Sequence, residues 1–122
     1  MIDVSNDRFQ TLIDAALASL PGEHAAGIKN VAILYEEEPS PQQLANGDVH
    51  PGFTLLGLYE GVALPRRQGR TDYPPDRITL FKGPLSRRAR DLPDLKEQIR
   101  HTLWHEIAHY YGLDHDQIRD RE

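Results

Sequence analysis

Cysteine is absent from this 122-residue chain, and so is any long apolar run. Without cysteine there can be no disulfide framework, and a zinc ion would have to be held by histidine, aspartate or glutamate. No run of about 18 apolar residues occurs, so a membrane-spanning helix is not expected. The N-terminal segment also lacks the basic and apolar regions of a secretory signal. We therefore expect a cytoplasmic protein with no membrane partner.

Positive charge is scarcer than negative charge. The chain has 14 Lys and Arg residues against 19 Asp and Glu residues, a formal net charge of −5. Binding to a phosphate backbone depends on clustered Lys and Arg, so nucleic acid is not an expected partner. Two arginine clusters, at 66–70 and 87–90, are interpreted as solvated surface groups, with a patch for an acidic partner as the alternative.

The length and composition fit a single domain over residues 1–122. Hydrophobic residues make up 39% of the chain and charged residues 27%. This balance is typical of a folded protein with a core, and 122 residues are too few for two well-packed domains.

Residue spacing in the first two thirds predicts an α+β fold. Apolar residues at helical intervals indicate a helix over 6–19, with Ser5 or Asn6 as its N-cap. Short apolar runs predict strands at 31–35 and around Ile78, and two more within 55–64, separated by a turn. The Pro- and Gly-rich stretch 39–53 predicts a loop with at most one helical turn. The expected sheet therefore has three or four strands.

The last third predicts one long helix. Asp91 is a candidate N-cap, Pro93 suits the first turn, and Gly112 suits a left-handed C-terminal position. At about 100° per residue, His105 and His109 project only about 40° apart, away from the apolar stripe of the helix. The two imidazoles are therefore expected to point the same way.

The stretch "HEIAHYYGLDH" has the spacing of a zinc site. Histidines four residues apart on a helix supply two ligands, and Gly112 would let the chain turn back and present His115 as the third. Three protein ligands leave one position for water, whose pKa zinc lowers to about 7. Glu106 is placed to accept the proton of that water and pass it to a leaving amine. The predicted chemistry is amide hydrolysis.

Several alternatives stay open at this point. The histidines could be ordinary surface groups, or they could bind metal without catalysis. Asp114 or Asp116 could replace a ligand or accept a hydrogen bond from an imidazole, and His101 could line the site one turn before His105. The residue that would stabilise the oxyanion is not evident from spacing; the candidates from elsewhere in the chain are Tyr59, Tyr73 and His50.

The motif resembles the HExxHxxGxxH signature of the metzincin zinc peptidases. That resemblance implies His105, His109 and His115 as zinc ligands and Glu106 as general base. Metzincins carry a Met-containing turn after the motif, whereas the only methionine here is Met1.

Three segments, "LLGLYEGVALPRR", "PPDRITLFKGP" and "HTLWHEIAHYYGL", are similar to the bacterial minimal-zincin family of short proteins that end soon after the metal motif. The resemblance implies a minimal zincin-like domain, with a small sheet packed on an N-terminal helix and a C-terminal metal-binding helix. It also implies a zinc metallopeptidase acting on a peptide or protein. The alternative is a zinc-binding interaction module with weak or no catalysis.

One further expectation concerns substrate placement. A strand within Leu55–Leu64 is expected to form the edge of the sheet above the metal-binding helix. An extended peptide could then pair with it by strand addition.

Overall fold

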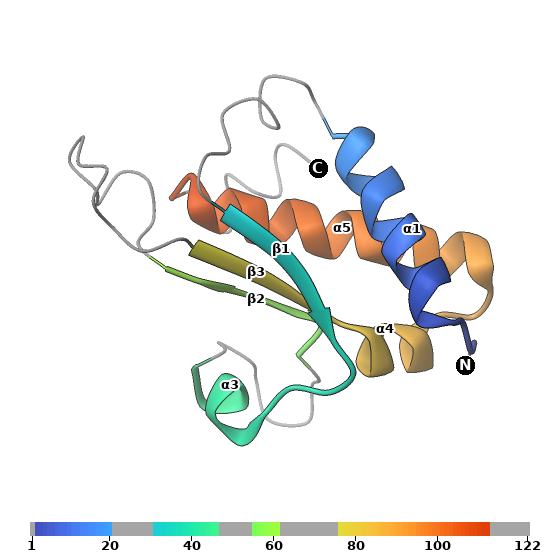
Figure 1. Cartoon of the computed structure of the whole chain (residues 1–122), viewed down its shortest axis with the longest axis horizontal. Helices are drawn as coiled ribbons and strands as arrows, with labels where there is room; N and C mark the ends of the chain where they lie inside the picture. Colours follow the sequence, from blue (N-terminus) through green and yellow to red (C-terminus); the bar gives the residue numbers. More distant parts are fainter. Residues whose placement is uncertain (1, 21–30, 47–54, 62–75, 113–122) are drawn as a thin grey trace.

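The computed structural model describes residues 2–20, 31–46, 55–61 and 76–112. In chain order they form α1 (Asn6–Ala18), β1 (Val31–Glu36), α3 (Pro41–Asn46), β2 (Gly57–Glu60), β3 (Asp76–Phe81), α4 (Lys82–Arg88) and α5 (Leu92–Tyr110). Figure 1 shows the helices around a small sheet, which confirms the predicted α+β class. Within this part of the chain no helix has both the length and the apolar character needed to cross a membrane.

The sheet has three strands in the order β1-β3-β2. Strand β1 is parallel to β3, with Ile33 opposite Ile78, and β2 is antiparallel to β3, with Tyr59 opposite the same residue. Among the described residues, strand β2 therefore lies at an edge of the sheet, as expected for the 55–64 segment. The second strand predicted there, after Gly61, falls outside the described residues.

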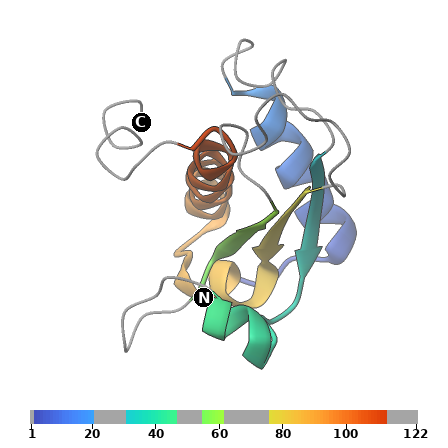
Figure 2. The same cartoon turned by 90° about the vertical axis from the view of Figure 1, so that its left-hand side faces the viewer.

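Helices α1 and α5 cover one face of the sheet (Figures 1 and 2). The helix predicted over 6–19 is confirmed, and its N-cap Ser5 accepts a hydrogen bond from the backbone of Arg8 at 3.1 Å. Its apolar positions pack against the inner side of α5 and the central strand. The main buried residues of this core are Phe9, Ile13, Ile78, Leu80, Leu95, Ile99, Leu103 and Ile107.

Helix α5 begins and ends where the sequence predicts. The Asp91 side chain accepts a hydrogen bond from the backbone N–H of Asp94 at 2.9 Å, and Pro93 lies in the first turn. Gly112 follows the helix with φ of 76°, in the left-handed region that glycine occupies at little cost. The long metal-motif helix is therefore fixed by its own capping residues.

Helix α4 is not predicted by the sequence, because a Gly-Pro pair such as Gly83-Pro84 usually ends an apolar run. Pro84 is the third residue of this short helix, where a missing N–H costs nothing since the first turn has no intrahelical acceptor. The Gly83 N–H instead donates to the Glu37 carbonyl at 2.8 Å. Arg87 of this helix forms an ion pair with Glu38, and both side chains remain exposed, in keeping with the interpretation of the 87–90 arginines as solvated surface groups.

Sheet and helix approach each other closely at Gly57, the first residue of β2. A Cβ atom there would lie 2.7 Å from Thr102 Cγ2 and 3.4 Å from Glu106 Cγ, both on α5. We expect Gly57→Ala to lower the free energy of unfolding by about 1–3 kcal/mol, the usual cost of overpacking a filled contact. Urea denaturation measures this difference.

A second substitution makes the test specific. Thr102→Ser removes the methyl group that the new Cβ would meet, so the double variant should recover most of the stability lost by Gly57→Ala. Equal stability of Gly57→Ala and the wild type would contradict the tight contact between β2 and α5.

Candidate metal centre

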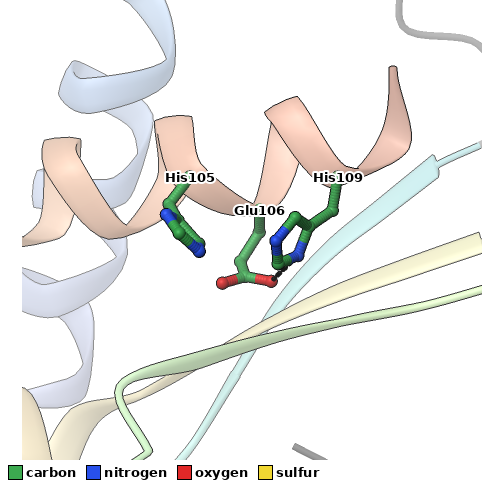
Figure 3. A group of neighbouring side chains, drawn as sticks. All are labelled: His105, Glu106 and His109. Carbon is green, nitrogen blue, oxygen red and sulfur yellow. Dashed lines mark hydrogen bonds and ion pairs between the residues drawn. The ribbon is translucent and has the colours of Figure 1, made fainter. Parts of the chain in front are cut away.

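His105, Glu106 and His109 project from one side of α5, with the carboxylate between the two imidazoles (Figure 3). Both histidines are partly buried, whereas Glu106 is only 6% exposed. The close approach of Gly57 to Glu106 brings the edge strand β2 against this part of the helix. Helical spacing, as predicted, places the two imidazoles together.

The spacing of these side chains fits a metal ion. One potential ligand atom from each of the three residues lies within 4.8 Å of the others, and the imidazole centroids are 4.7 Å apart. Tetrahedral zinc with bonds of about 2.0–2.1 Å needs donor atoms about 3.3 Å apart. The potential ligand atoms lie within 4.8 Å of one another and the side chains project from one side of α5, so the residues present fit a shared zinc ion.

Glu106 also makes a hydrogen bond within the group. Its Oε1 lies 3.2 Å from Nδ1 of His109. In the tautomer that donates from Nδ1, the imidazole keeps the lone pair of Nε2, which is the form that binds a metal. A buried carboxylate is costly without such a partner or a nearby positive charge. The geometry permits Glu106 either to ligate the metal or to accept a proton beside it.

Several candidate residues lie outside the described residues: His115, Asp114, Asp116, His50 and Tyr73. The assignment of His115 as third ligand therefore stays a prediction, as does the role of Glu106 as general base. His101 lies one turn before His105 on α5 and is exposed.

Tyr59 is one of the sequence candidates for oxyanion stabilisation. Its hydroxyl donates to Asp76 Oδ2 at 2.5 Å, and its ring packs edge-on against Tyr110 at 6.3 Å. Asp76 is 1% exposed. This hydrogen bond joins β2 to β3 and holds the edge strand in place. Spacing in the sequence carries no signal for Asp76, because its partner is 17 residues away.

Gly57 shapes the site, and sequence reasoning did not identify it. The available signal was an isolated glycine inside a strand pattern, which often marks a close approach of another element. Its partners on α5 lie more than 40 residues further along the chain, so the sequence could not identify them.

Comparison with known proteins agrees with this geometry. Residues 28–122 match the family described as zincin-like metallopeptidase. Among solved structures, a conserved hypothetical protein from T. thermophilus superposes with a TM-score of 0.56 at 19% sequence identity. The match covers 97% of this chain and 100% of that one, and at this identity it supports the fold alone. No curated protein matches the sequence significantly.

The family match covers most of the chain, including the helix that carries the two histidines and the strand that packs against it. The small mixed sheet, the long C-terminal helix and the His-Glu-His group all agree with that match. The chain belongs to the zincin-like metallopeptidase family.

Proposed function

We propose that the protein is a zinc-dependent peptidase that hydrolyses peptide bonds with Glu106 as general base. The observation that carries the proposal is the buried Glu106 carboxylate between two partly buried imidazoles, beside an edge strand. A buried carboxylate beside two potential metal ligands is suited to proton transfer, whereas a carboxylate with only a surface role is normally exposed to solvent.

Each side chain has a distinct role in this proposal. His105 and His109 would hold the metal, with His115 as the third ligand. Zinc, when bound, would supply a water with a pKa of about 7 and polarise the substrate carbonyl. The Glu106 carboxylate would accept the proton of the attacking water and pass it to the leaving amine. His109 keeps its metal-binding nitrogen available through its hydrogen bond to Glu106.

The proposed substrate is a peptide or protein segment in extended form. Strand β2 lies at the sheet edge, and its first residue touches the turn of α5 that carries Glu106. A peptide paired with this edge by backbone hydrogen bonds would run past the metal pair. Nucleic acid and membrane partners are not part of the proposal, in keeping with the net charge of −5.

The direct test is hydrolysis of a diverse peptide library by the zinc-loaded full chain, with products identified by mass spectrometry. We expect cleavage that is lost when a chelator removes the metal and returns when zinc is restored. Binding of one zinc per chain without cleavage of any peptide would instead identify a zinc-binding interaction module.

A further inference from the structure

A groove of about 290 Å³ lies along α5, on the N-terminal side of the two histidines His105 and His109. Its lining comprises Leu56, Arg88 of α4, and five residues of α5 between Asp94 and Thr102. This volume is close to the lower end of ligand pockets, about 300 Å³. It is enough for one long side chain.

The groove lies next to His105 and His109 along α5. Thr102 and His101, which line it, precede Glu106 and His105 by about one helical turn. Leu56, on the opposite wall, immediately precedes Gly57, the residue whose Cβ position touches both Thr102 and Glu106. A substrate peptide paired with β2 beside His105 and His109 would therefore continue over the groove.

The directions of β2 and α5 decide which half of a bound peptide reaches the groove. Gly57 lies against Thr102 and Glu106, and Tyr59 lies against Tyr110, so strand and helix run the same way (Figure 1). Antiparallel pairing is the more stable kind per residue, so the peptide would run opposite to β2. The residues that follow the cleaved bond then lie over the groove.

Element dimensions set the distance. Glu97 precedes Glu106 by nine residues, which is about 13 Å along a helix at about 1.5 Å per residue. An extended peptide covers that length in about four residues at about 3.3 Å each. A long side chain from the second to the fourth residue after the cleaved bond can therefore reach Glu97.

Two residues of the lining, Asp94 and Glu97, are carboxylates that could receive a cation. A hydrogen bond from the Arg90 backbone N–H holds the pKa of Asp94 below its usual value, and a hydrogen bond from the Arg100 side chain does the same for the pKa of Glu97. Both carboxylates are therefore ionised near neutral pH. Arg90 and Arg100 do not line the groove, and their ion pairs are exposed and weak.

The lining also includes one arginine among the described residues, Arg88. It is two residues before Arg90, whose backbone N–H donates to Asp94 Oδ2 at 2.9 Å. Gln98, which also lines the groove, donates from its Nε2 to Asp94 Oδ2 at 3.1 Å and so holds that carboxylate in place. Glu97 is the lining carboxylate nearer to His105 and His109 along α5, and its side chain is 58% exposed, so a substrate side chain can reach it.

We propose that this groove is a specificity subsite for a lysine or arginine side chain located two to four residues after the cleaved bond, with Glu97 as the residue that selects it. The inference rests on the proposed peptidase function, since it names the substrate class of that same site.

The test measures peptide binding to zinc-loaded Glu106→Gln protein, in which turnover is suppressed. Fluorescent peptides that carry Lys, Gln or Glu at the second, third or fourth residue after the cleaved bond are compared by anisotropy. We expect the Lys peptide to bind about fivefold more tightly than the Gln peptide at low salt, with the difference shrinking as salt is added. Adding Glu97→Gln should remove the difference, and Glu97→Lys should reverse it in favour of the Glu peptide.

Glu38→Gln is the matched control, because it also removes an exposed carboxylate paired with an arginine but lies outside the groove lining. An equal loss of preference in this control, or an unchanged preference in Glu97→Lys, overturns the inference. A preference located before the cleaved bond overturns it as well. Charge-selective binding by a protein that hydrolyses no peptide supports the subsite and refutes the peptidase proposal, so the two failures are distinguishable.

Discussion

Replacing Glu106 with glutamine should lower peptide hydrolysis by at least about 100-fold, while the protein keeps its zinc. Glutamine has nearly the shape of glutamate, so the buried position between the imidazoles stays filled and α5 is undisturbed. What disappears is the group that accepts the proton of the attacking water. The measurement is kcat on a peptide selected from the library, with zinc content determined on the same sample.

The matched control is again Glu38→Gln, which neutralises a carboxylate far along the chain from the metal motif and should leave kcat unchanged. Loss of zinc together with activity in Glu106→Gln would show that the carboxylate holds the metal. The group of three potential ligand atoms within 4.8 Å makes that outcome chemically reasonable, and the general-base assignment would then be wrong.

His105→Ala and His109→Ala should each weaken zinc binding by roughly 10³-fold, since each removes one direct bond from a site with few ligands. In each variant one imidazole of the pair remains, and the ring removed is the one whose centroid lies 4.7 Å from it in the wild type. The remaining imidazole cannot make both bonds to the metal. Competition with a chromophoric chelator gives the affinity, and circular dichroism confirms that α5 is retained.

His101→Ala provides the control on the same helix. This histidine is exposed and one turn before His105, so its removal should leave zinc affinity within about twofold of the wild type. Zinc affinity unchanged in both His105→Ala and His109→Ala would rule out this pair as the metal site. An equally large effect in His101→Ala would move the site toward the N-terminus of α5.

The sequence by itself determined the features that depend on neighbouring residues. The capping of α5 by Asp91 follows from a side chain that reaches a backbone N–H three residues on. The left-handed Gly112 follows from the freedom of glycine at positive φ. The pairing of His105 with His109 follows from the helical period. Such interactions span a few residues, so their spacing is visible without the fold.

Short strands are predictable nearly as well, because a run of apolar residues indicates burial whatever the partners are. Strands β1 and β3 lie where the runs at 31–35 and around Ile78 predict them. The same reasoning fails for α4, since Gly83-Pro84 discourages a helix in isolation. Its Gly83 N–H is satisfied by Glu37, 46 residues earlier, a contact that no local pattern contains.

Only the tertiary structure decided which residues surround His105 and His109. The burial of Glu106, the contact of Gly57 with Thr102 and the groove beside Glu97 all arise where β2 packs against α5. Gly57 is separated from these residues of α5 by about 40 positions or more in the chain, and their proximity depends on the order β1-β3-β2 of the described strands, which places β2 at the edge. Residue spacing sets the direction of side chains within one element. The distance between two elements is set by the packing of the whole core, and for that reason the sequence contained the candidate ligands but not the shape of the site around them.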